Sequence, residues 1–138
     1  MNMKKIVLAT FFLCSAFFFS QKNMSYVRIS YGSICCGTPS TKPVMDYLKK
    51  FEKSNQLKAF EILEQSGLGR EGEFTLYIGT DKLGKKQKMT FRKGLQSVIT
   101  LQNKNRKQDR DGTVDYDPEV TVYKSDLTGI KNLTIYKK

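Results

Sequence analysis

Two adjacent cysteines, Cys35 and Cys36, are the residues whose type and spacing point most directly to chemistry. They lie in the stretch YGSICCGTPS, residues 31–40, whose glycines and proline predict a loop. Neighbouring Cα atoms are about 3.8 Å apart across a trans peptide, whereas most disulfides join Cα atoms about 4.4–6.8 Å apart. A bond between these cysteines would therefore be strained and easily reduced. We expect such a vicinal disulfide, with a soft-metal site or an intermolecular bridge as the alternatives.

The absence of histidine limits the catalysis available to this chain. Histidine is the side chain best matched to proton transfer near neutral pH, so Ser–His and Cys–His catalytic pairs are excluded. Asp115 and Asp117 are neighbouring carboxylates, but they lie in a segment with Gly112 and Pro118, and no nucleophile is paired with a base. We therefore predict that the protein is not an enzyme and uses no cofactor.

Residues 82–110 are the most basic segment of a chain whose net charge is +11. Lys85, Lys88 and Arg92 recur at helical spacing, which predicts a positive ridge on one helix face. Such a ridge could bind an anionic surface or a protein outside the cytoplasm, and an ordinary solvated face is the alternative. Nucleic acid is not an expected partner, because only Phe91 lies among these cations to stack on a base.

An acidic segment, DRDGTVDYDPE at 109–119, resembles part of an Asp-rich calcium-binding loop. If Gly112 takes the sixth place of that loop, the first ligand position falls on Lys107 and the twelfth on Pro118. The pattern therefore predicts only a weak calcium site, with a solvated turn as the alternative. The candidate ligands are Asp109, Asp111, Asp115, Asp117 and Glu119.

The stretch GLGREG, residues 67–72, matches the letters of a G-x-G-x-x-G nucleotide-binding loop. That motif needs a helix after it, whereas the alternating residues 72–80 predict a strand. The stretch is therefore typical of a glycine-rich hairpin connection.

The N-terminus has the pattern of an export signal. Two lysines precede an apolar run, Ile6–Phe19, that is shorter than the about 20 residues needed to span a bilayer. We expect cleavage after Ser20, so that residues 1–20 are removed and residues 21–138 form one domain; a cut after Ala16 is the alternative. The protein would then be periplasmic or secreted, in a space where cysteines are mostly oxidised.

Hydrophobic periodicity predicts alternating strands and helices. Two apolar stripes predict the helices, one through Val44, Tyr47, Leu48 and Phe51 and the other through Phe91, Leu95 and Val98. Residues 56–67 are ambiguous between helix and strand, and context favours a strand. The expected elements are strand 24–31, helix 42–55, strand 56–67, strand 72–80, helix 85–105, an acidic loop at 109–118, and two closing strands that form a hairpin around 126–129.

This order, β-α-β-β-α-β with one extra C-terminal strand, is that of an α+β, ferredoxin-like or split βαβ fold. Cys35 and Cys36 fall between the first strand and the first helix, a position similar to that of the Cys-x-x-Cys pair in heavy-metal-associated domains. The resemblance implies binding of a soft metal ion, although the two-residue spacer is missing here. Thiolates favour Cu(I) or Zn(II), and Met45 is close enough in sequence to add a thioether.

Taken together, these features predict a small exported α+β protein whose function is binding or interaction. The alternative is a protein that handles thiols or metals through Cys35 and Cys36.

Overall fold

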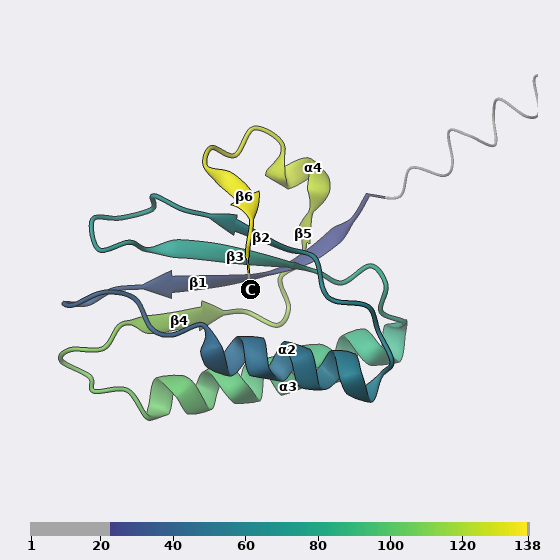
Figure 1. Cartoon of the computed structure of the whole chain (residues 1–138), viewed down its shortest axis with the longest axis horizontal. Coiled ribbons are helices and arrows are strands. Elements are labelled where there is room, and N and C mark those ends of the chain that lie inside the picture. The colour runs from purple at the N-terminus through teal and green to yellow at the C-terminus, as the bar shows by residue number, and fades with distance from the viewer. Residues whose placement is uncertain (1–22, 138) are drawn as a thin grey trace, which may run out of the picture.

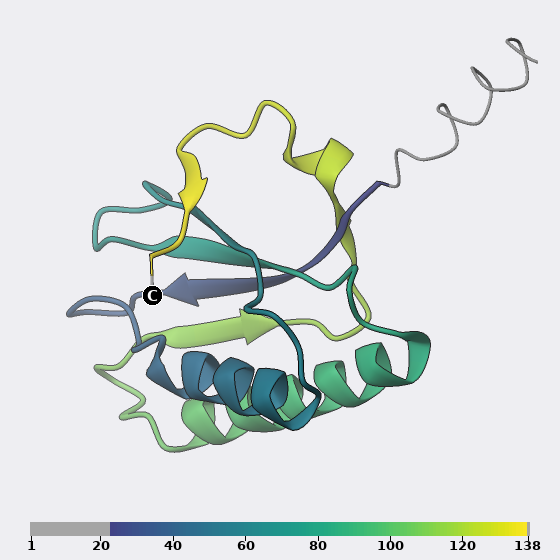
Figure 2. The same ribbon diagram turned by 45° about the vertical axis from the view of Figure 1, so that its right-hand side comes forward.

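The computed structural model describes residues 23–137, which form two layers (Figures 1 and 2). A six-stranded antiparallel sheet is one layer, and two long helices, α2 and α3, lie side by side as the other. The predicted export signal at 1–20 lies outside the described residues. In chain order the elements are β1 (Ser25–Gly32), α2 (Lys42–Ser54), β2 (Ile62–Gln65), β3 (Phe74–Gly79), α3 (Lys85–Lys104), β4 (Thr113–Tyr116), β5 (Val122–Tyr123), α4 (Lys124–Leu127) and β6 (Leu133–Ile135).

The sheet has the strand order β4-β1-β3-β2-β6, and β5 also pairs with β1. β1 is paired along both sides: β3 lies on one side, and β4 and then β5 lie on the other. In this register Tyr31 is opposite Phe74 on one side and Val114 on the other. The α+β class is thereby confirmed, but the sheet has one strand more than the sequence predicted.

The C-terminal third of the chain differs most from the prediction. Residues 113–116 were expected to be loop, yet they form β4, in which Val114, between half-buried Thr113 and exposed Asp115, is buried in the core. The two closing strands do not form a hairpin: β5 pairs with β1, whereas β6 pairs with β2. The short helix α4 separates them and buries Leu127 against Tyr26 and Tyr77 on the sheet face away from α2 and α3.

The main core lies between the sheet and the two long helices. β1 contributes alternate residues Val27, Ile29 and Tyr31 to it, as a half-buried strand should. On α2 the expected stripe is confirmed, with Val44, Leu48 and Phe51 buried. On α3 the buried residues are Phe91, Leu95 and Ile99, so the third contact falls four residues after Leu95, and Val98 is only half-buried.

Several tyrosines are buried at the helix–sheet interface, and this burial predicts alkaline instability. Desolvation raises the pKa of Tyr31, whose hydroxyl has no partner among residues 23–137, and raises the pKa of Tyr47 and of Tyr116 to about 12. A pKa raised by folding means that the unfolded chain loses these protons first. The stabilisation is therefore complete below pH about 10 and is lost as the pH rises from about 10 to about 12.

We expect the free energy of unfolding, measured in urea, to fall between pH about 10 and pH about 12, by up to about 1.4 kcal/mol per pH unit for each such tyrosine. Tyr116→Phe is the matched control, because the buried Tyr116 hydroxyl lacks a partner among the described residues and its loss should reduce the slope without unfolding the protein. A free energy that is flat over this range would contradict the prediction.

Candidate functional site

The loop between β1 and α2, residues 33–41, carries both cysteines. Cys35 and Cys36 lie at disulfide-bonding distance, with sulfurs 2.08 Å apart and Cα atoms 3.7 Å apart. Both side chains are exposed, and Gly37 follows them with a φ of 102°, a left-handed conformation that glycine adopts without strain. The vicinal pairing is therefore confirmed in geometry, and it stiffens an exposed loop instead of joining two elements.

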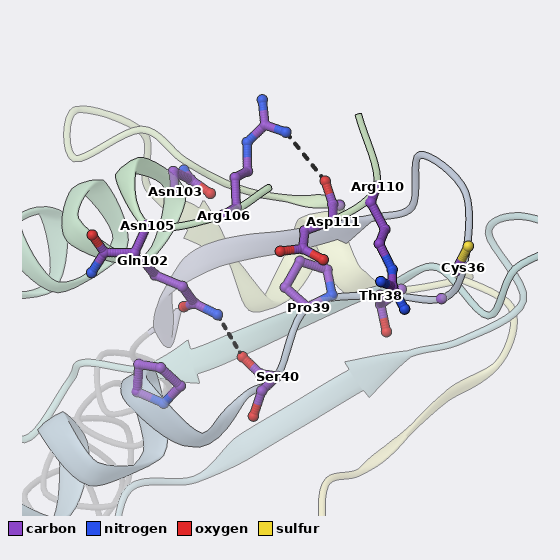
Figure 3. A pocket seen from close by; sticks show the side chains of 13 residues that line it. Cys36, Thr38, Pro39, Ser40, Gln102, Asn103, Asn105, Arg106, Arg110 and Asp111 are labelled. Carbon is purple, nitrogen blue, oxygen red and sulfur yellow. Dashed lines mark hydrogen bonds between the residues drawn. The ribbon is translucent and has the colours of Figure 1, made fainter. Parts of the chain in front are cut away.

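A cleft of about 530 Å³ lies beside this loop, where α2 begins and α3 ends (Figure 3). One wall is the cysteine loop, including Cys36 and Pro39, and the other is the C-terminal turn of α3 with the loop that leads to β4. Topology brings the two walls together, because β1 and β4 are neighbouring strands and their loops leave the same end of the sheet. The lining residues are Cys36, Gly37, Thr38, Pro39, Ser40, Pro43, Gln102, Asn103, Asn105, Arg106, Arg110, Asp111 and Gly112.

Two amides on the last turns of α3 hold the cleft together. The Gln102 amide nitrogen donates to the Ser40 carbonyl at 2.8 Å, which ties the helix to the cysteine loop. Asn103 accepts from the backbone N–H of Val114 at 2.9 Å and donates to the Val114 carbonyl at 2.8 Å. The Gln102 side-chain oxygen is buried and has no partner within residues 23–137, so one acceptor at the cleft is free.

The two arginines of the cleft differ in what they bind. The Arg106 guanidinium donates to the backbone carbonyls of Gln108 and Asp111, each at 3.2 Å, and so shapes the loop to which it belongs. The Arg110 guanidinium is exposed and makes no hydrogen bond or ion pair with the part of the chain that the structure describes. Its side chain extends toward the wall that carries Thr38 (Figure 3). Arg110 is therefore the free positive charge of this cleft.

The predicted anion-binding ridge lies on α3, with Lys85 in the first turn and Lys88 one turn later. Arg92, the third member of the ridge, bonds to the protein itself. Its guanidinium donates to the carbonyls of Pro118 and Val120 and, at 2.8 Å, to the Thr121 hydroxyl. These bonds fix the segment between β4 and β5 to the helix. The ridge stays a prediction, now with two exposed or half-exposed lysines as its available charges.

We expect Arg92→Gln to lower the free energy of unfolding by about 2 kcal/mol, because it removes charge-assisted bonds to two backbone carbonyls. Lys93→Gln, an equal charge change at the exposed neighbouring residue, should stay within about 0.5 kcal/mol of wild type. Urea unfolding of the three proteins measures both effects. Equal stabilities of the two variants would show that Arg92 does not anchor the 118–121 segment.

The acidic residues of the predicted calcium loop are spread along a strand and two turns. Asp115 lies on β4 opposite Ser30, while Asp111 and Asp117 accept hydrogen bonds from the backbone N–H groups of Lys107 and Glu119. Across residues 23–137 no group of three or more His, Cys, Asp or Glu side chains is placed to hold a metal ion. The geometry thus lends no support to a calcium site at 109–119, or to a soft-metal site of three or more such ligands around Cys35 and Cys36.

The GLGREG stretch joins two paired strands, as its glycines predicted. β2 and β3 are antiparallel neighbours, and Gly67 and Gly72 have φ values of 72° and 82° in the connection between them. The Leu68 N–H donates to the Glu73 carbonyl at 3.2 Å and closes the turn. No helix follows, so the feature that a nucleotide loop needs is missing here.

Comparison with known proteins identifies no relative of this chain. No family model, curated protein or solved structure matches this chain. Over residues 23–137 neither long helix is apolar enough to cross a bilayer. The sequence pattern identified Cys36, but it missed Arg110 and Gln102, because nothing in their spacing shows that β4 brings their loop beside the cysteines.

Proposed function

We propose that this protein is a small, exported, non-catalytic binding protein whose cleft beside Cys36 takes a small anionic ligand. The observation that carries this proposal is the unpaired guanidinium of Arg110 in a cleft of about 530 Å³. A guanidinium stays charged at all physiological pH values, and its planar fork matches a carboxylate or a phosphate. An anion is therefore the chemistry that this site accepts most readily.

Two further groups limit the ligand. The Gln102 oxygen is a buried acceptor without a partner among the described residues, so a ligand N–H or O–H near the anionic end would satisfy it once the side chain turns this oxygen into the cleft. Pro39, Pro43 and the Cys36 sulfur offer apolar surface on the opposite wall. A hydroxy acid, an acidic sugar or an acylated amino acid combines these features in one molecule of suitable size.

Export and the finer fold assignment belong to the same proposal. Two lysines before an apolar run, Ile6–Phe19, support an export signal, and a disulfide between Cys35 and Cys36 suits an oxidising compartment. The order β4-β1-β3-β2 of four strands, with α2 and α3 on one face, supports a split βαβ arrangement to which β5 and β6 are additions.

The ligand proposal is tested by NMR titration of the labelled protein with citrate, glucuronate, N-acetylglutamate and inorganic phosphate. We expect at least one of these anions to shift the Arg110 side-chain N–H signals together with the backbone signals of Thr38 and Gly112. Arg110→Gln should weaken that binding by about tenfold or more, because it removes the one guanidinium of the cleft that bonds to none of the described residues.

The matched control is Arg70→Gln, which removes the same charge from the exposed turn between β2 and β3. It should leave the affinity within about twofold of wild type, since bulk electrostatic attraction between separated exposed charges is screened by salt. Equal losses in the two variants, or no shift with any of the four anions, would refute the cleft as an anion site.

The exposure of both cysteines favours a second candidate function, thiol or metal handling after reduction of the disulfide. Intact-mass analysis of the exported protein, alkylated with and without prior reduction, decides between the two. An anion should still bind in the cleft of Cys35→Ser/Cys36→Ser, because Arg110 remains and only the Cys36 part of the apolar wall is lost, and the unreduced wild-type protein should add no alkyl group. Two alkylated cysteines without reduction would favour thiol chemistry, and the same spectrum fixes the cleavage site.

A further inference from the structure

The two edges of the sheet are finished in different ways. At the β4 edge, the Asn103 side chain bonds both the N–H and the C=O of Val114, so the outward peptide groups of that residue are occupied by α3. At the other edge lies β6, the yellow strand outside β2 in Figures 1 and 2. No residue among 23–137 plays the role of Asn103 there.

The hydrogen bonds between β2 and β6 show which peptide groups face outward. The Tyr136 N–H donates to the Ile62 carbonyl at 2.9 Å, and the Ser66 N–H donates to the Asn132 carbonyl at 3.2 Å. Bonding alternates along an antiparallel pair, so the even-numbered residues of β6 face β2 and the odd-numbered ones face away. Leu133 and Ile135 therefore direct two N–H and two C=O groups outward, and Ile135 is 74% exposed.

Charge decides what can pair with this edge. In the register centred on Thr134, two copies joined at β6 across a two-fold axis would place Leu133 opposite Ile135 of the second copy. Lys137 follows β6 and Lys131 lies in the turn just before it, so this register brings lysines of the two copies near each other on both sides of the axis. Like charges facing each other destabilise strand pairing, and lysines at an edge are a common protection against self-association. A segment with carboxylates at those two places would be attracted instead.

We propose that the outer edge of β6 binds an extended acidic segment of another protein, which joins the sheet as an antiparallel strand. The peptide groups of Leu133 and Ile135 supply four backbone hydrogen bonds, and Ile135 supplies an apolar contact. Lys131 and Lys137 hold carboxylates at the two ends of the segment. This surface is separate from the cleft beside Cys36, so it stands or falls independently of the ligand proposed there.

The test uses a capped, fluorescently labelled peptide, ETVTVTE, whose glutamates fall beside Lys137 and Lys131 and whose valines fall beside Ile135 and Leu133. The control peptide has the same sequence and charge, with both valines N-methylated to remove the N–H groups that face β6. Fluorescence anisotropy at about 0.15 M salt should show binding of the first peptide and at least about tenfold weaker binding of the second. Equal binding of the two would mean that charge alone attracts them, and no binding of either would also overturn the proposal.

Variants of the protein test whether the peptide binds at the outer edge of β6. Ile135→Pro removes one outward N–H while leaving the bonds to β2, and Lys137→Glu reverses one flanking charge; each should weaken binding by about fivefold or more. Lys50→Glu, a charge reversal on exposed α2, should change it by less than about twofold. An equal loss in Lys50→Glu would overturn the assignment to β6, as would a wild-type dimer that Ile135→Pro dissociates, because the occupant would then be a second copy.

Discussion

Gly112→Ala is expected to destabilise the protein by about 2–4 kcal/mol and to distort the cleft. Gly112 is buried just before β4, and a Cβ placed there would overlap the carbonyl group of Gly32 and lie 3.0 Å from the Pro39 side chain. The carbonyl belongs to the central strand and the proline to the loop that carries the cysteines, so neither can move freely. Urea unfolding measures the loss, and the NMR signals of Thr38 should shift even without ligand.

The control for this substitution is Gly32→Ala, on the other side of the same contact. A Cβ at Gly32 would meet only atoms of Thr113, at 3.7 and 3.9 Å, which is ordinary van der Waals distance. Its effect should therefore stay within about 1 kcal/mol. A Gly112→Ala protein as stable as wild type would show that the β1 and β4 loops do not approach each other as closely as described.

Gly94→Ala is expected to cost about 2 kcal/mol, although the same change in an isolated helix stabilises by about 1 kcal/mol. Gly94 lies in the middle of α3, and the phenol of Tyr47 from α2 lies directly over it. A Cβ at Gly94 would overlap the Tyr47 hydroxyl and lie 2.8 Å from two ring carbons. Tyr47 cannot withdraw cheaply, because its hydroxyl donates to the Phe91 carbonyl at 2.9 Å and its ring packs against Phe51 and Phe91.

The sign of the effect should reverse when Tyr47 is removed. In a Tyr47→Ala background, Gly94→Ala should be neutral or stabilising by up to about 1 kcal/mol, which gives a coupling of about 2–3 kcal/mol in the double-mutant cycle. Urea unfolding of the four proteins provides the measurement. Additive effects would mean that the ring and the glycine do not share the same space.

Most of the N-terminal two-thirds of the fold could be predicted because β1, α2, β3 and α3 each show their own period. β2 is the exception, because residues 56–67 were ambiguous and only Ile62–Gln65 form a strand. β1 alternates Val27, Ile29 and Tyr31, and α2 and α3 have apolar stripes, so local pattern and burial agree. Glycine in a helix interior is a weak helix former, so local propensity alone does not explain Gly94. A glycine is needed at this position because the ring of Tyr47 occupies the space of a Cβ. Tyr47 lies 47 positions earlier in the chain, and no local sequence pattern connects the two residues.

The C-terminal third could not be predicted in the same way, because its strands are short and their partners are distant. β4, β5 and β6 contain four, two and three residues, which is too few for a clear alternation. Val114 is the one fully buried side chain of β4, and the acidic residues around it in the sequence obscure the strand pattern. Burial of Leu127 against Tyr26 and Tyr77 breaks the expected closing hairpin, and only tertiary structure shows it.

The candidate site was predictable in part. The adjacency of Cys35 and Cys36, in a chain with an export pattern, predicted a vicinal disulfide as the first of three alternatives, and the sulfurs lie 2.08 Å apart. Arg110 was one cation among many in a basic segment. It becomes distinct only because β4 pairs with β1 and folds its loop against the cysteines, while Arg106 bonds to its own loop.

The position of β1 in the interior of the sheet, paired along both sides, affects when the chain can fold. β1 comes first in the described chain, yet its partners end at Gly79, Tyr116 and Tyr123. In a chain that crosses a membrane N-terminus first, the second hydrogen-bonding edge of β1 would stay unpaired until residue 123 has crossed. Under the export proposed above, the few long-range contacts that β1 can make early would delay folding until most of the chain has crossed the membrane. A topology of this kind would suit a polypeptide that crosses a membrane unfolded.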